Sequence, residues 1–150
     1  GLGEKKEILN FRQHVESQSS TLTKINDQSN YYKRKNLYLN FFNKYKIQFY
    51  DVKVKVDRLD NILNLLKIQY VDILKIDTEG YDFNVIKGLG EHIKNIKYIY
   101  FEHHFHNMLI KGYTLDNIHN YLVKNNFKKV FKIKMYFRKT FEYIYLNKFF

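Results

Sequence analysis

A short apolar segment that ends in two carboxylates and a glycine limits the folds open to this chain. Residues 71–76 read Val-Asp-Ile-Leu-Lys-Ile, residues 77–80 read Asp-Thr-Glu-Gly, and apolar positions then recur at helical spacing from Phe83. A strand that passes directly into a helix is the repeating unit of an α/β sheet, and ligands bind such sheets at the carboxyl ends of the strands. The segment therefore predicts an α/β protein with a functional site at residues 77–80.

The rest of the chain continues this alternation of strand and helix. The patterns predict loop over 12–30 and loop with some helix over 31–45. Strands are expected at 7–11, 48–56, 71–76, 97–102, 127–136 and 141–147, and helices after Asp57, Asp82 and Thr114. The near-continuous apolar run at 71–76 indicates a strand buried on both faces. The last two strands, joined by a short basic turn, predict an antiparallel hairpin that closes a mostly parallel sheet.

The composition narrows the class of protein. A chain of 150 residues suits one domain, and the absence of cysteine excludes disulfides and thiolate zinc sites. It has no apolar run long enough to cross a membrane, so a cytoplasmic protein is expected. The net charge of +11 raises a nucleic-acid-binding alternative. Because the lysines are spread among Asn, Ile and Tyr residues, a bias in coding composition explains the charge equally well, and no nucleic-acid partner is expected.

Carboxylates end two successive strands of the expected sheet. Asp77 and Glu79 follow the first strand, and Glu102 ends the next. If these strands are neighbours, their ends lie about 5 Å apart. The three carboxylates could then share a proton, a cation or a substrate hydroxyl. The alternative is that Asp77 or Glu79 only caps the helix that begins near Asp82.

Two histidines directly follow Glu102 in the sequence. His103 or His104 could act as a general base near pH 7. Together with Glu102 and Asp77 they could also hold a divalent metal. Their spacing is not a recognised zinc signature, and no metal site is expected.

Several motifs, in order, resemble the FkbM-type methyltransferases. Lys-Ile-Asp-Thr-Glu-Gly-Tyr-Asp at 75–82 and Val-Ile-Lys-Gly at 85–88 are similar to the central signature of the family. The segments 19–22, 54–63 and 99–102 are similar to further family elements. The resemblance implies a Rossmann-like class I fold and S-adenosylmethionine (SAM)-dependent methylation of a hydroxyl on a small molecule or glycan. It implies catalytic roles for Asp77, Glu79, Glu102, His103 and His104, and cofactor contacts for Ser20, Asp77 and Gly80.

One family element does not occur in the sequence. Members of the family bind SAM on a first strand and a glycine-rich loop, but the chain contains no Gly-x-Gly-x-x-Gly. We therefore expect residues 1–150 to be a single partial domain, its C-terminal part without the N-terminal strands, that binds SAM poorly alone. A non-catalytic binding or assembly module is the alternative. The strand at 71–76 would then have an unpaired edge, through which the chain could self-associate.

Overall fold

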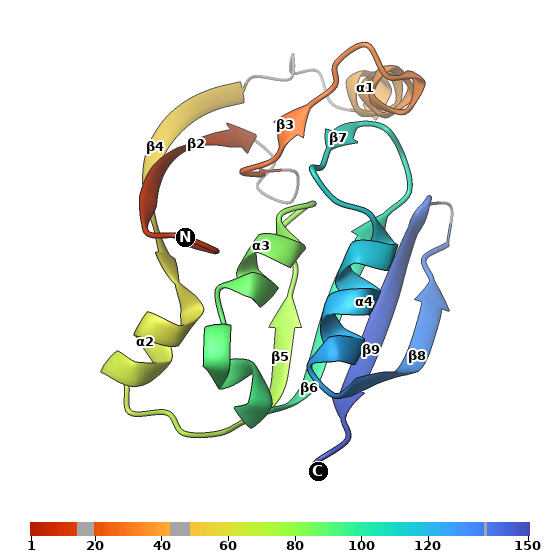
Figure 1. Cartoon of the computed structure of the whole chain (residues 1–150). Helices are drawn as coiled ribbons and strands as arrows, with labels where there is room; N and C mark the ends of the chain where they lie inside the picture. Colours follow the sequence, from red (N-terminus) through yellow and green to blue (C-terminus); the bar gives the residue numbers. More distant parts are fainter. Residues whose placement is uncertain (15–19, 43–48, 137) are drawn as a thin grey trace.

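The computed structural model describes residues 1–14, 20–42, 49–136 and 138–150. The chain has a mixed α/β fold with one four-stranded sheet, one three-stranded sheet and a small two-stranded pair (Figure 1). The four-stranded sheet has the order β5-β6-β9-β8. Its strands are β5 (Val71–Ile76), β6 (Ile96–His104), β8 (Phe127–Lys134) and β9 (Thr140–Asn147).

The predicted neighbours in this sheet are confirmed. β5 pairs parallel with β6, with Ile76 opposite Phe101, and β8 pairs antiparallel with β9. The hairpin returns so that β9 lies between β6 and β8. A mostly parallel sheet is wrong, however, because β6–β9 and β8–β9 are both antiparallel. The hairpin inserts its last strand beside β6, so only one of the three pairings is parallel.

The strand predicted at 48–56 belongs to a different sheet. β4 (Phe49–Arg58) pairs antiparallel with β2 (Glu7–His14) along eight residues and parallel with β1 (Leu2–Gly3). Figure 1 shows this ribbon curving away from β5. The strand before α2 (Leu59–Leu65) thus does not continue the sheet of β5, contrary to the single alternating sheet that the element order predicts.

Two helices cover one face of the four-stranded sheet. They are α3 (Asp82–Lys87) and α4 (Leu115–Lys124), and the 3-10 helix η2 (Gly90–Asn95) follows α3 (Figure 1). Thr114 caps α4 with a capping box, as its side chain predicts. The core under the helices contains Ile76, Val85, Ile86, Leu89, Ile99, Phe101, Ile118, Leu122, Tyr143 and Tyr145. A Cβ at Gly88 would lie 2.2 Å from the carbonyl oxygen of Gly3, so only glycine lets α3 pack this closely on β1.

Other local predictions differ from the structure. Residues 30–42, expected to be mainly loop, form α1 (Asn30–Phe42), and the expected loop at 12–30 contains the end of β2 and β3 (Lys24–Ile25). β5 is not buried on both faces, since Ile73 is 63% exposed. Its apolar run is typical of a central strand, but among the described residues β5 pairs only with β6.

Candidate functional site

The signature loop after β5 has a left-handed backbone. Glu79 has φ +49° and Gly80 has φ +90°, conformations that are uncommon for a residue such as glutamate. The positive φ of Gly80 favours glycine, and a Cβ there would also lie 3.0 Å from Leu109 Cδ1, so that this side chain would have to shift. Strained non-glycine residues concentrate at functional sites. The loop that the sequence singled out is thus a tightly constrained structure.

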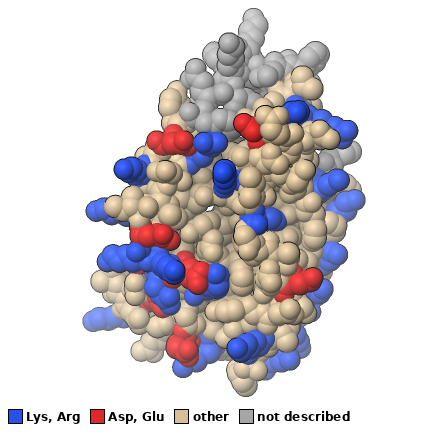
Figure 2. All heavy atoms as spheres, turned by 45° about the horizontal axis from the view of Figure 1, so that its top comes forward, with Lys and Arg blue, Asp and Glu red and all other residues tan. Residues whose placement is uncertain are grey.

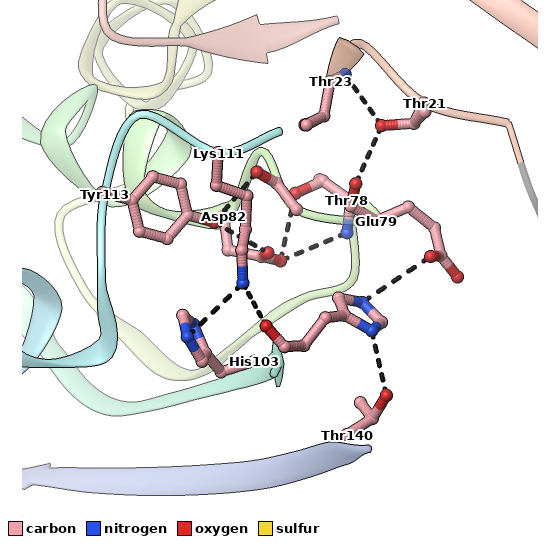
Figure 3. A network of polar contacts seen from close by, with 11 residues as sticks. Thr21, Thr23, Thr78, Glu79, Asp82, His103, Lys111, Tyr113 and Thr140 are labelled. Carbon is pink, nitrogen blue, oxygen red and sulfur yellow. Dashed lines mark hydrogen bonds and ion pairs between the residues drawn. The ribbon is translucent and has the colours of Figure 1, made fainter. Parts of the chain in front are cut away.

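Thr21, from the segment 19–22 that resembles a family element, lies against this loop. Thr21 Oγ1 donates to the carbonyl oxygen of Glu79 at 2.8 Å and accepts from the Thr23 amide at 2.8 Å (Figure 3). Thr21 also pairs with Arg12 in an isolated antiparallel bridge. Ser20, the predicted cofactor contact, directly precedes Thr21, while Ser19 lies outside the described residues. The fold therefore joins two segments that lie almost sixty positions apart in the chain.

Asp82 is the best-connected carboxylate of the loop. It is 1% exposed, and its Oδ1 accepts from the Thr78 amide at 3.3 Å and the Thr78 hydroxyl at 3.0 Å (Figure 3). The Tyr113 hydroxyl donates to the Gly80 carbonyl at 2.9 Å and lies 3.4 Å from Asp82 Oδ2. Burial raises the pKa of Asp82 to about 6, despite these hydrogen bonds. The sequence pattern alone predicts no role for Asp82 beyond the start of the helix.

The capping alternative for Asp77 and Glu79 is wrong. The residue before α3 is Tyr81, and no side chain makes a capping hydrogen bond there. Asp77 is exposed at the end of β5 and makes no hydrogen bond to the described residues. Its carboxylate is thus available to a ligand.

Glu102 lies beside the end of β5, as predicted, but it does not end its own strand, because β6 continues to His104. The register pairs Ile76 with Phe101, so Asp77 and Glu102 follow paired residues on adjacent strands. Burial, and then the negative charges of Asp77 and Glu79, raise the pKa of Glu102 to about 7. A buried carboxyl with a pKa near neutrality can take up a proton at physiological pH. The structure therefore brings the three predicted carboxylates into one electrostatic cluster.

The histidines are placed differently from the prediction. His103 and His104 lie within β6 rather than beyond its end, because β9 continues to pair with them, with His103 opposite Phe141 and His104 opposite Thr140. Successive residues of a strand point to opposite faces. Only His104 therefore shares the side of Glu102.

His104 contacts residues from both neighbouring segments. Its Nδ1 lies 3.0 Å from Thr140 Oγ1 and its Nε2 lies 3.6 Å from Glu79 Oε2 (Figure 3). Burial lowers the pKa of His104 to about 3, so the ring is neutral at pH 7 and the contact with Glu79 is not an ion pair there. His104 is therefore a poor proton acceptor in this state.

His103 faces a lysine that no sequence motif predicts. Lys111 Nζ lies 3.4 Å from His103 Nε2 and donates to the His104 carbonyl oxygen (Figure 3). Burial lowers the pKa of His103 to about 4 and that of Lys111 to about 8. Lys111 follows β7 (Leu109–Ile110) with no surrounding motif, so only the tertiary fold reveals it.

A metal centre has no support in this geometry. Among the residues that the structure describes, no three His, Asp or Glu side chains are placed to hold a metal ion.

A cavity of about 510 Å³ lies between α3 and α4, away from the three carboxylates. Tyr113 lines this cavity and also bonds the signature loop. We assign the site to the strand edge because the carboxylates and the strained loop are there.

A comparison with models of protein families shows the family of this chain. The model of the methyltransferase FkbM domain matches residues 1–129. The chain belongs to the FkbM methyltransferase family. Neither the comparison with curated proteins nor that with solved structures found a match. The match contains the signature loop, Glu102 and Lys111, so the whole strand-edge site lies within the FkbM domain.

The surface and the helices add two observations on partners. Figure 2 shows Lys and Arg side chains dispersed over the visible face, with Asp and Glu among them. In the part of the chain that the structure describes, this face has no continuous basic track, the feature that the nucleic-acid alternative requires. Among the described helices, none is both long and apolar enough to span a membrane.

Proposed function

We propose that this FkbM-family chain takes part in SAM-dependent O-methylation of a hydroxyl on a small molecule or glycan. The observation that carries the proposal is Glu102, a buried carboxyl with a pKa of about 7 beside the carboxyl end of β5, in a chain of the FkbM methyltransferase family. Methylation of a hydroxyl requires a group that accepts its proton. Glu102 has the position and the pKa for that task.

The carboxylates of the edge also fit SAM. The cofactor has an ammonium group and ribose hydroxyls, both of which carboxylates bind well. Asp77 is exposed and has no hydrogen-bond partner among the described residues, so it is the residue that we assign to these groups. Ser20 and Gly80 would act beside it, Gly80 by holding the loop in its left-handed turn. When bound, SAM supplies an electrophilic methyl group.

In the proposed reaction the protein positions the acceptor and removes its proton. SAM, held by Asp77, Ser20 and Gly80, would supply the methyl group, and the chain would hold the acceptor hydroxyl beside the carboxylates. The proton of the hydroxyl passes to Glu102, which the negative charges of Asp77 and Glu79 make a stronger base. Burial keeps His104 neutral, so it orients Glu79 and Thr140 rather than taking the proton.

Transfer of a labelled methyl group from SAM tests the proposal. In Glu102→Gln we expect the rate to fall by about 10²–10⁴, the usual cost of losing a general base. The wild-type rate should rise with pH through about 7 as Glu102 ionises, and the variant should lack this rise. Glu91→Gln is the control, since Glu91 is exposed on η2, and its rate should not change. A normal rate and pH profile in Glu102→Gln would contradict the proposal.

A further inference from the structure

Lys111 is a partly buried ammonium group that has no counter-ion among the described residues. Within this part of the chain its Nζ contacts the His104 carbonyl oxygen, His103 Nε2 and, at 5.8 Å from the centroid, the Tyr113 ring. Among the described residues, none of the ion pairs includes Lys111. Asp82 is the one carboxylate that acts on it, from beyond ion-pair distance. An uncompensated charge in such a place is costly, and proteins normally pair it.

The histidines around Lys111 have ring nitrogens without partners. His103 Nδ1, His104 Nε2 and His106 Nδ1 are buried and make no hydrogen bond with the described residues. The three residues are 5%, 5% and 8% exposed, whereas buried polar atoms nearly always find a partner. Because a lysine can only donate, its contact with Nε2 makes that atom the acceptor and places the hydrogen of His103 on Nδ1. The unpartnered atom of His103 is therefore a donor.

Cations from several elements surround this cluster. Lys35 of α1, Lys111 and Lys139 of the turn between β8 and β9 all lower the pKa of His106. Glu79, 3.6 Å from His104, is the acidic group at its edge, and Arg138 and Lys35 act on Glu79 in turn. The cluster formed by His103, His104, His106 and Lys111 therefore contains one cation, Lys111, and a donor without an acceptor, the Nδ1–H of His103, and Glu79 and Asp82 are the acidic groups that act on it among the described residues.

We propose that the cluster of His103, His104, His106 and Lys111 binds an anionic oxygen group, such as a carboxylate or phosphate, on the acceptor substrate. The ammonium group would gain its counter-ion, and the Nδ1–H of His103 would gain an acceptor. The assignment of this anionic group to the acceptor substrate rests on the proposed function. His104, a member of the cluster, points to the same side of β6 as Glu102, so Glu102 would then meet a hydroxyl of the same molecule. The substrate class is thus an acidic hydroxyl compound, including an acidic sugar.

Inorganic phosphate is the probe for this site. We expect phosphate, added to about 0.1 M at fixed ionic strength, to raise the melting temperature and to shift the ring NMR signals of His103, His104 and His106. Absence of both effects in the wild-type chain would overturn the proposal, whatever any variant shows.

A matched pair of variants locates the anion. Lys111→Met removes the charge and keeps the apolar stem, and we expect phosphate affinity to fall about tenfold or more. Lys129→Met removes the same charge from an exposed position of β8 and should leave the affinity within about twofold. Equal losses in both variants would show a long-range charge effect only and would refute the site.

Two further measurements separate the acceptor from the cofactor and from catalysis. SAM also has a carboxylate, so SAM that displaces phosphate and loses affinity in Lys111→Met would assign the site to the cofactor and overturn the acceptor assignment. Phosphate that binds alongside SAM supports the acceptor. If methyl transfer is absent but phosphate binding depends on Lys111, the proposed function fails while the anion site stands.

Discussion

The two faces of the β5-β6-β9-β8 sheet have very different surroundings. On one face Ile99 and Phe101 are 0% exposed beneath α3 and α4, whereas on the other Ile73 is 63% and Phe131 50% exposed. Glu102 points to the side of the open face. Tyr98, Tyr100 and Glu102 are every second residue of β6 and so point to one side, and Tyr98 is the register partner of Ile73. The covered face thus provides the packing, and the open face carries the chemistry at its edge.

The largest expected effect is the difference in stability between the same isoleucine-to-alanine change made on the covered face and on the open face. Ile99→Ala removes a fully buried side chain and should lower the free energy of unfolding by about 2–5 kcal/mol. Ile73→Ala makes the same change on the adjacent strand and should cost no more than about 0.5 kcal/mol, because most of the side chain is already in water. Urea unfolding measures both. Equal losses would mean that the open face is covered in solution and would break the comparison.

The next effect is the pH dependence of the free energy of unfolding that Glu102, on the open face, produces. The pKa of Glu102 is raised from 4.5 to about 7 in the folded chain, so the folded state binds more protons than the unfolded state between these pH values. The free energy of unfolding therefore falls as pH rises through this window. Glu102→Gln removes that fall and should be more stable than wild type above pH 7, by up to about 3 kcal/mol.

Urea unfolding at several pH values across this window checks the prediction. Glu91→Gln serves again as the control and should follow the wild-type curve. If Glu102→Gln and wild type differ by a constant amount at every pH, Glu102 does not titrate in this window.

A smaller effect tests the helices that cover the sheet. Thr114→Ala removes the side chain that caps α4 through the Asn117 amide and should cost about 1 kcal/mol. Thr114→Ser keeps the hydroxyl and should restore most of the loss. Thermal unfolding of the two variants measures the difference. Indistinguishable stabilities would show that the cap does not hold α4 on the sheet.

The smallest change in stability is expected at the edge of the open face. Ile73→Lys places a charge on β5, the end strand of its sheet among the described residues, and should change stability by no more than about 0.5 kcal/mol. Charged residues on an edge strand oppose pairing with another chain. Sedimentation at increasing concentration should therefore show less self-association than in wild type. Unchanged association would place the contact elsewhere.

Local patterns in the sequence predicted much of the fold and part of the site. The strand at 71–76, its parallel neighbour, the Thr114 cap and the closing hairpin all follow from short-range periodicity and capping, and the structure confirms them. The carboxylate cluster followed from the rule that parallel strands end at one edge. Three of the predicted residues, Asp77, Glu79 and Glu102, interact for that reason.

Tertiary structure decided what depends on contacts between distant segments. The sequence alone determined that an α/β unit ends in carboxylates, because strand, turn and helix are set by neighbouring residues. It could not show that β4 pairs with β2, that Lys111 reaches His103, or that Thr21 bonds Glu79. These contacts join segments that carry no shared local pattern, and the burial that shifts the pKa values of Glu102 and Lys111 exists only after they form.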